Sequence, residues 1–260
     1  MNLWRAHGLG NDYLVWECEA KLSSSLVVAL CDRHRGVGGD GVLEPLPGAD
    51  AAVRIWNPDG SVAEKSGNGL RIFARWWVER RGGPAAFAIR TDAGEVACEV
   101  EGDAVRVEMG RAELRFAERR FPDPDLSVTA IGIGNPHAVV FREEPLDALP
   151  WRAWGAALEV HPTFPARTNV QFARIAGPGA LEVRIWERGA GETLASGSSA
   201  CAVVAAAVFT RRARAGTFAV HMPGGTLEVS IDEANGMVQR GPVEVVGVVA
   251  MDPRWWRTRS

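Results

Sequence analysis

Two serines in this sequence stand where helices are expected to begin. Ser66 is followed by glycine and by the helix-forming segment 70–81, and Ser196 is followed by glycine and by the segment 200–215. A serine at the start of a helix caps backbone N–H groups, and the positive end of the helix dipole favours an anion such as a carboxylate. The sequence therefore predicts two helix N-termini that can bind a carboxylate.

Polar side chains lie in the predicted loops around these helix starts. Glu187 and Arg188 are adjacent in the sequence and can pair with an ammonium group and with a carboxylate, respectively. A site that combines such groups suits a zwitterion, so we expect a small amino acid as the ligand. The neutral members of the set are asparagines: Asn11, Asn57, Asn68, Asn135 and Asn169.

Motifs for phosphate, metal or disulfide chemistry are weak. The stretch GVGGDG at residues 36–41 fits GxGxxG by its letters, but it follows the charged segment CDRHR where an apolar strand is required. We therefore interpret it as a glycine-rich loop and expect no cofactor and no metal. The four cysteines show neither CxxC nor regular spacing: Cys18, Cys31, Cys98 and Cys201.

An internal repeat organises the elements that carry these residues. Segments 87–110 and 218–241 align without a gap, and each reads as two alternating strands joined by a tight turn. Segments 56–75 and 186–205 match at nearly the same spacing, and each runs from a tryptophan through Ser-Gly into a helix. Two matches at one spacing predict a duplicated α/β unit.

The duplication predicts two similar halves around a cleft. We place the first half at residues 1–113, completed by the tail 247–260, and the second half at 114–246. The two Ser-Gly helix starts would then meet across a pseudo-twofold axis. Paired helix N-termini of this kind would favour an anion such as a carboxylate.

Composition excludes several function classes. The chain has 260 residues and a formal net charge of −3, so it offers no basic field for nucleic acid. The longest apolar run, 200–209, is too short to span a bilayer and predicts a buried helix. The N-terminal residues have no signal-peptide core, and we expect a cytoplasmic protein with no membrane partner.

The sequence resembles the diaminopimelate epimerases, within the wider group of cofactor-independent amino-acid racemases. The matching blocks run in family order over nearly the whole chain and together are highly specific. They are HGLGND (7–12), CDRHRGVGGDG (31–41), NPDGSVAEKSGNG (57–69), GNPHAVVF (134–141), FPARTNV (164–170) and WERGAGETLASGSSACA (186–202).

The resemblance implies an α/β (α+β) fold of two pseudo-symmetric domains, each a curled, mostly antiparallel sheet around a central helix. It also implies a homodimer that needs neither pyridoxal phosphate nor metal. The residues that match the family's substrate-binding positions are Asn11, Asn57, Gly67, Asn68, Asn135, Asn169, Glu187, Arg188, Gly197 and Ser198.

One departure from the family is central to the chemistry. The resemblance implies two cysteines that act as acid and base on opposite faces of the substrate α-carbon, and this chain has Ser66 and Ser196 at those positions. A thiol ionises at about pH 8.5, whereas a serine hydroxyl is a much weaker acid that normally needs a neighbouring base. None of the chain's cysteines fits either position by sequence. The family's two-thiol mechanism is therefore absent as written.

Three interpretations remain open. In the first, the chain is a diaminopimelate epimerase whose two thiols were replaced by experiment. In the second, it is a relative with different chemistry, an isomerase or dehydratase of another amino acid, in which His137, His7 or Glu187 serves as the base for a serine. In the third, the cleft binds an amino acid without converting it.

Diaminopimelate is the ligand that we prefer. It carries a second carboxylate and ammonium, and the residues that match the role of holding this far end are all present: Asn11, Asn57, Asn135 and Asn169. The predicted function is therefore inversion at the α-carbon of LL- or meso-diaminopimelate, a lysine and peptidoglycan precursor. We expect this activity to be impaired by the two serines.

Overall fold

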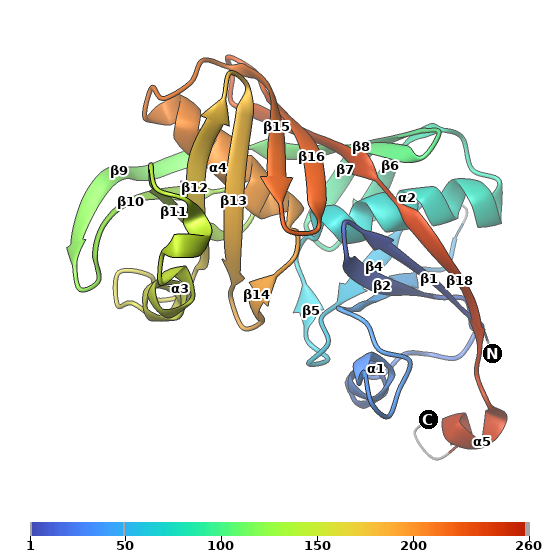
Figure 1. The fold of residues 1–260 in the computed structure, drawn as a ribbon. Helices are drawn as coiled ribbons and strands as arrows, with labels where there is room; N and C mark the ends of the chain where they lie inside the picture. The colour runs from blue at the N-terminus through green and yellow to red at the C-terminus, as the bar shows by residue number, and fades with distance from the viewer. Residues whose placement is uncertain (1, 49, 258–260) are drawn as a thin grey trace. The chain divides into compact units, whose positions relative to one another are not determined.

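The structure, a computed structural model, describes residues 2–48 and 50–257 and divides into two compact units. The first unit comprises Met1–Val107 with Gly241–Ser260, and the second comprises Glu108–Arg240. Each is a mixed α+β structure made mostly of strands, as predicted (Figure 1). In the described part of the chain, no helix is long and apolar enough to cross a membrane.

The first unit consists of a curved sheet, three further strands and three helices. The strand order of the curved sheet is β18-β1-β2-β3-β4-β5, in which only β2 and β3 run parallel. Strands β6, β7 and β8 form successive antiparallel hairpins. The elements are β1 (Asn2–Gly8), β2 (Asn11–Trp16), α1 (Ser24–Cys31), β3 (Val42–Pro45), β4 (Val53–Trp56), β5 (Val62–Ala63), α2 (Gly67–Arg81), β6 (Ala86–Thr91), β7 (Gly94–Glu101), β8 (Ala104–Arg111), β18 (Glu244–Ala250) and α5 (Pro253–Arg257).

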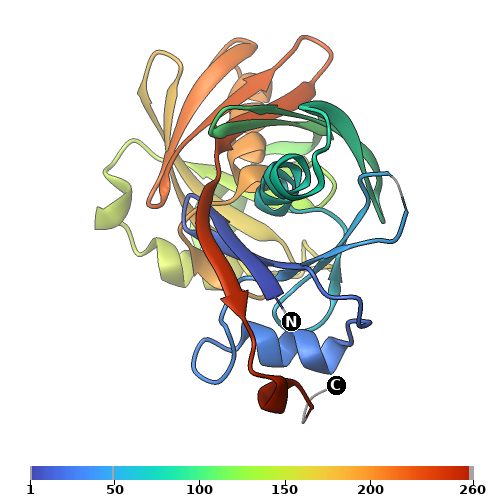
Figure 2. The same cartoon turned by 90° about the vertical axis from the view of Figure 1, so that its right-hand side faces the viewer.

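Helix α2 is the central helix of this unit, and Figure 2 shows it nearly end-on with strands around it. The helix begins after Ser66, whose side chain accepts the N–H of Gly69, so the predicted serine cap is confirmed. It ends at Gly82, which adopts a left-handed conformation with φ 67°. Because nearly every residue from Gly67 to Trp76 is buried, the start of α2 is held firmly in the core.

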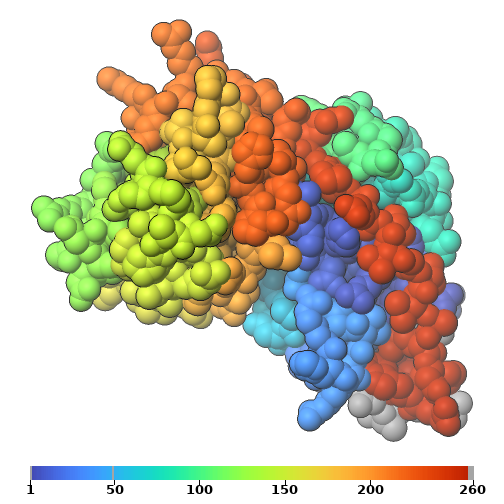
Figure 3. Space-filling model, viewed as in Figure 1, coloured from blue at the N-terminus to red at the C-terminus, as the bar shows by residue number. Residues whose placement is uncertain are grey.

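The C-terminal segment of the chain completes the first unit. Strand β18 pairs antiparallel with β1, from Asn2 opposite Ala250 to His7 opposite Glu244. The space-filling view shows the red C-terminal residues running beside the blue N-terminal ones (Figure 3). Beyond β18, the ring of Trp256 stacks on the ring of Trp16 at a centroid distance of 5.1 Å. This contact fixes the tail to the unit's own core.

The second unit repeats the same plan around helix α4. The strand order is β9-β10-β11-β12-β13-β15-β16-β17, with β14 paired to β13 and with parallel pairs only at β11–β12 and β13–β15. The elements are β9 (Glu113–Pro122), β10 (Asp125–Gly132), β11 (Pro136–Phe141), α3 (Trp151–Glu159), β12 (Asn169–Gly177), β13 (Ala180–Glu187), β14 (Gly191–Thr193), α4 (Gly197–Phe209), β15 (Gly216–Met222), β16 (Gly225–Ile231) and β17 (Gly236–Pro242).

Helix α4 is buried as predicted, but its predicted end at residue 215 is wrong. Residues 200–207 are all buried, and the helix stops at Phe209. Arg211 has a φ of 59°, and the N–H groups of Arg212 and Ala213 both bond to the carbonyl of Ala207. This left-handed turn provides hydrogen-bond donors for the last carbonyls of the helix. The residues that follow Phe209 are helix-forming by composition, so the sequence did not predict the turn.

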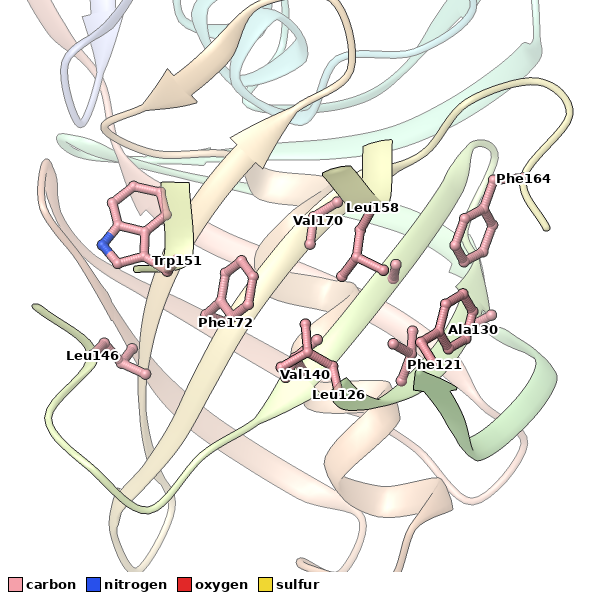
Figure 4. Packing of buried hydrophobic residues seen from close by; sticks show 12 residues of the cluster. Phe121, Leu126, Ala130, Val140, Leu146, Trp151, Leu158, Phe164, Val170 and Phe172 are labelled. Atoms are coloured by element: carbon pink, nitrogen blue, oxygen red, sulfur yellow. The ribbon is translucent and has the colours of Figure 1, made fainter. Parts of the chain in front are cut away.

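The hydrophobic core of the second unit includes a cluster between its sheet and α3. Figure 4 shows Trp151 and Leu158 of α3 facing Val170 and Phe172 of β12, with Val140 of β11 beside them. These residues are all 1% exposed or less. Since β12 begins at the predicted site residue Asn169 and β11 begins one residue after Asn135, their burial fixes the backbone around both asparagines.

The sequence repeat corresponds to matching hairpins, one set in each unit. The predicted turn at residues 101–103 joins β7 to β8, and the predicted Asn-Gly turn at Asn235 joins β16 to β17. Each set contains a further hairpin, β6–β7 and β15–β16, so each copy has three strands where two were expected.

Candidate functional site

Ser66 stands at the entrance to α2 and has two hydrogen-bond partners. Its Oγ accepts the backbone N–H of Gly69 at 3.0 Å, and the hydroxyl of Tyr13 lies 3.0 Å from the same oxygen. Ser66 is half-buried, whereas Tyr13 is only 6% exposed. The serine hydroxyl therefore acts as a helix cap and is also paired with a phenol.

A chain of hydrogen bonds links the first turn of α2 to β2. The buried Arg71 donates to Oδ1 of Asn68 at 2.8 Å, and Nδ2 of Asn68 donates to Oδ1 of Asn11 at 2.9 Å. Asn11 in turn donates to Asp40 at 2.8 Å. The structure thus brings together the predicted residues Asn11, Ser66, Gly67 and Asn68. Asn11 retains one amide hydrogen beyond the one given to Asp40.

An ion network supports this chain of hydrogen bonds. Arg33 donates to Asp12 and to Asp40, each at 2.7 Å, and Arg5 donates to Asp12 at 2.6 Å. Burial opposes ionisation of Asp12, but the hydrogen bonds from Arg33 and Arg5 outweigh it and hold the pKa below its usual value. Burial raises the pKa of Asp40, and the nearby charge of Asp12 acts in the same direction.

Asn57 lies in a different local setting within the first unit. It follows β4, and its side chain donates to the hydroxyl of Ser61 at 2.9 Å. Its backbone N–H bonds to the Ser61 carbonyl at 2.8 Å, which closes the turn 57–61. No hydrogen bond recorded among the described residues joins its side chain to the asparagines near α2.

Ser196 holds the equivalent position at the entrance to α4. It is 8% exposed, and its Oγ lies 3.5 Å from both the Ser199 N–H and the Ser198 hydroxyl. A Cβ at Gly197 would lie 2.0 Å from Oε1 of Gln239. Only glycine fits at this first helical position, because any side chain would displace the buried glutamine.

The remaining predicted residues of the second unit gather at the start of β12 and the end of β13. Oδ1 of Asn169 accepts the backbone N–H of Arg188 at 3.0 Å, and its Nδ2 donates to the Pro136 carbonyl at 3.1 Å. Asn169 thus links the backbone of Arg188 to the segment that contains Asn135. Glu187 is half-buried beside Arg188, at the end of β13.

Asn135 is oriented by a buried histidine. Nε2 of His137 lies 2.7 Å from Oδ1 of Asn135, and Nδ1 lies 3.0 Å from the side-chain nitrogen of Gln171. Gln171 also donates to Oγ of Ser199, in the first turn of α4, at 3.0 Å. A neutral ring protonated at Nε2 satisfies both contacts, with Nδ1 as the acceptor.

Burial lowers the pKa of His137 to about 3, and the positive charge of Arg188 acts in the same direction. The ring is therefore neutral at pH 7, and both of its nitrogens are occupied by Asn135 and Gln171. The hypothesis that His137 serves as the base for a serine is not supported. His7, the second candidate, lies 3.4 Å from the N–H of Gly10 and 3.8 Å from Glu244.

A pocket of about 510 Å³ opens on the second unit beside Asn135 and His137. Its lining residues include Arg111, Phe164 and Arg167. Arg167 is bonded to the buried Glu159, which also accepts the N–H of Gly189 at 2.7 Å. Among the described residues, no group of three or more His, Cys, Asp or Glu side chains is placed to hold a metal ion.

None of the four cysteines lies at a helix start, and none forms a disulfide. Cys31, Cys98 and Cys201 are buried, and Cys18 is half-buried. Burial raises the pKa of Cys31 to about 12, so this thiol stays protonated at neutral pH. Cys201 lies inside α4, five residues beyond its serine cap.

The glycine-rich stretch 36–41 is a loop that caps the end of α1. The N–H groups of Val37 and Gly38 both bond to the carbonyl of Leu30, and that of Gly39 bonds to Cys31. A phosphate cradle needs such N–H groups to point outward, and here they bond to the helix instead. The structure therefore agrees with the interpretation of GVGGDG as a loop.

Sequence reasoning missed three side chains that shape the site. Tyr13 follows the predicted Asn11 by two residues, and Asp40 lies in the glycine-rich loop. Gln171 lies two residues after Asn169 on β12, and residues two apart on a strand share a face of the sheet. This spacing from a predicted site residue could have identified Gln171. The same period of two relates Tyr13 to Asn11 along β2 and could have identified it, whereas Asp40 lies in a loop far from Asn11 in the sequence and left no comparable signal.

Comparisons with known proteins find similar sequences that extend over nearly the whole chain. A sequence model of the family described as Diaminopimelate epimerase matches residues 3–115 and 129–246. A diaminopimelate epimerase from Pelotomaculum thermopropionicum is 40% identical, covering 95% of this chain and 97% of its own length. One from Desulforudis audaxviator is 39% identical, covering 99% of this chain and all of its own length.

The fold also has counterparts among solved structures. A probable proline racemase from Agrobacterium radiobacter K84 superposes with a TM-score of 0.77 over 97% of this chain and 93% of its own, at 20% identity. At that identity the likeness concerns the fold alone. The family match and the relatives at about 40% identity go further. They show that this chain belongs to the diaminopimelate epimerase family.

Proposed function

We propose that the chain binds LL- and meso-diaminopimelate and that inversion at the α-carbon is impaired by Ser66 and Ser196. The observation that carries the proposal is the pair of serine-capped helix starts, one in each unit. Each cap precedes a buried helix, α2 or α4, whose first-turn N–H groups point out of the helix end. Each such end provides hydrogen-bond donors and positive partial charge that suit a carboxylate and an enediolate.

The second unit itself offers groups that suit a diamino dicarboxylate. Glu187 offers a carboxylate for an ammonium group, and Arg188 offers a guanidinium for a carboxylate. Because Oδ1 of Asn135 accepts from His137, the amide of Asn135 presents N–H donors to a ligand. Asn169 likewise retains one amide hydrogen beyond the one that it donates to Pro136.

The chemistry of the two serines supports impaired inversion. A thiol is acidic enough to alternate between acid and base near neutral pH, and an aliphatic hydroxyl is not. The oxygen of Ser66 accepts the N–H of Gly69 at 3.0 Å, and that of Ser196 lies 3.5 Å from the N–H of Ser199. In both contacts the serine oxygen is an acceptor in a helix cap. The alternative function is therefore binding of the amino acid without rapid turnover.

Calorimetric titration tests the binding. We expect LL- and meso-diaminopimelate to bind more tightly than lysine, which lacks the second carboxylate. Asn169→Ala should weaken binding about fivefold, since it removes a hydrogen bond to the ligand worth about 1 kcal/mol. Ser230→Ala, at a half-buried serine of β16 whose hydroxyl bonds to Thr217, is the control and should leave binding unchanged. Equal affinities for lysine and diaminopimelate would contradict the proposal.

We also propose that the chain works as a cytoplasmic homodimer without pyridoxal phosphate or metal. Support for a dimer comes from β18, the edge strand of the first sheet. Val245, Val246 and Val248 on this strand are 42%, 60% and 50% exposed. An exposed apolar edge strand is a favourable surface for pairing with a second copy.

A further inference from the structure

Tyr13 is placed where it can exchange a proton with Ser66. Its hydroxyl lies 3.0 Å from Oγ of Ser66, at the N-terminus of α2, and its side chain is buried. The ring packs against Gly41, where a Cβ would lie 2.6 Å from Cε1 of the tyrosine. The glycine therefore makes room for the ring, and the ring holds the phenol at the serine.

The acceptor positions of Ser66 determine what this contact does. Oγ accepts the N–H of Gly69 along one lone pair, and a phenol that donates to Oγ takes the other. The serine proton then points away from both partners, out of the helix end. In the reverse arrangement the serine donates to the phenol oxygen. The pair can thus pass a proton in either direction.

We propose that Tyr13 and Ser66 form a proton-transfer pair through which this chain exchanges the α-proton of a bound amino acid on one face, without inverting it. The inference rests on the proposed function, from which it takes the bound amino acid. Ser66 is the group that meets the α-carbon, and Tyr13 acts through it.

The steps involve proton transfers alone. The Cα–H bond breaks and its electron pair stays on the substrate as an enediolate. The proton moves to Oγ of Ser66 while the serine proton moves to the oxygen of ionised Tyr13. The reverse transfer restores the Cα–H bond and the phenolate. Exchange of the phenol proton with solvent between these events introduces deuterium from D2O.

The second unit lacks such a pair. The hydrogen-bond partners of Ser196 in the described chain are the Ser198 hydroxyl and the Ser199 N–H, both at 3.5 Å. Neither is as acidic as a phenol, which in model peptides ionises at about pH 10. Inversion requires a proton donor on the opposite face. With one competent pair, the proton returns to the face that it left.

NMR in D2O tests this inference on the full chain. With LL-diaminopimelate as the probe, we expect loss of the α-proton signal without formation of the meso isomer. Tyr13→Phe should slow this exchange about 100-fold or more, the usual contribution of a general acid or base. Thr91→Val is the matched control, because it removes a buried hydroxyl of the same unit that bonds to Gly94. It should leave the exchange rate unchanged.

A second measurement separates proton transfer from packing. Tyr13 is the only tyrosine in the sequence, so global replacement by 3-fluorotyrosine alters this phenol alone. The more acidic phenol should change the exchange rate by about threefold or more at fixed pH. A purely structural ring would leave the rate unchanged.

The outcomes distinguish this inference from the proposed function. No exchange by the serine protein, equal exchange by Tyr13→Phe, or meso product at the exchange rate would each overturn the Tyr13–Ser66 pair. The proposed function is measured separately by the binding of diaminopimelate. Its failure would appear as absent binding, whatever the exchange rate.

Discussion

Nε2 of His137 lies 2.7 Å from Oδ1 of Asn135, and this contact fixes the direction of the asparagine amide. The histidine is 1% exposed, and Gln171 occupies its other ring nitrogen at 3.0 Å. The buried ring therefore acts as an orienting group for Asn135. It also links Asn135, through Gln171 and Ser199, to the first turn of α4.

This burial predicts a pH-dependent stability. The pKa of His137 is lowered to about 3 in the folded protein, from 6.5 in an unperturbed histidine. Between these values the unfolded chain binds a proton that the folded chain does not. The histidine's contribution is thus complete above about pH 6.5 and falls by about 1.4 kcal/mol per pH unit below it.

Urea unfolding of the wild type and of His137→Gln at pH 7, 6, 5 and 4 measures this effect. The wild-type free energy of unfolding should fall more steeply with decreasing pH than that of the variant. The difference between the two slopes isolates His137 from the other titrating groups. Parallel slopes would show that the ring becomes protonated in the folded state.

The close packing of Gly197 against Gln239 predicts that a side chain at position 197 lowers the stability of the protein. In Gly197→Ala the new Cβ would lie 2.0 Å from Oε1 of Gln239, so the first turn of α4 or the glutamine must move. We expect a loss of about 1–3 kcal/mol in thermal or urea unfolding. Gly177→Ala is the control, since a Cβ there meets nothing within 4 Å. Equal stabilities for the two variants would argue against the close packing.

The hydrogen bonds from Arg5 and Arg33 to Asp12 predict a second dependence of stability on pH. Because the pKa of Asp12 is lowered in the folded protein, its carboxylate stabilises the fold above about pH 4, and this is lost as pH falls further. Asp12→Asn should cost about 1–3 kcal/mol at pH 7 and less at pH 3. The exposed pair Arg120–Asp125 provides a control, Asp125→Asn, which should leave the stability nearly unchanged because solvent screens this pair.

The proposed dimer predicts a change of mass. Val246→Asp combined with Val248→Asp places two charges on the exposed edge strand β18 and should convert a dimer to a monomer in light scattering. Val160→Asp is a control in the second unit, at a valine that is 59% exposed. A dimer that survives the double substitution would place the interface elsewhere.

The local sequence predicted the elements that carry the site. Ser66 and Ser196 were identified as helix caps because capping is decided by a few neighbouring residues. The end of α4 was misplaced because Arg211 adopts a left-handed conformation that nothing in its residue type requires. Each aligned segment also contains most of a third strand, β6 or β15, which the interpretation of each copy as two strands missed.

The contacts between distant segments were beyond the sequence. Tyr13 meets Ser66 across 53 positions, and His137 meets Gln171 across 34. Such contacts depend on the order of the strands in the sheet and on the direction of each side chain. The periodicity of hydrophobic residues along the sequence does not specify either of these. The resemblance to a family supplied positions for ligand contacts, but it did not supply the groups that orient them.

The measurement that tests the central claim most directly is epimerisation by the variant carrying Ser66→Cys and Ser196→Cys. The account predicts that this variant interconverts LL- and meso-diaminopimelate, while each single variant is about 100-fold slower or more. Incorporation of deuterium from D2O should accompany the inversion. A double variant that still binds diaminopimelate but produces no epimer would contradict the claim that two thiols are all that the site lacks.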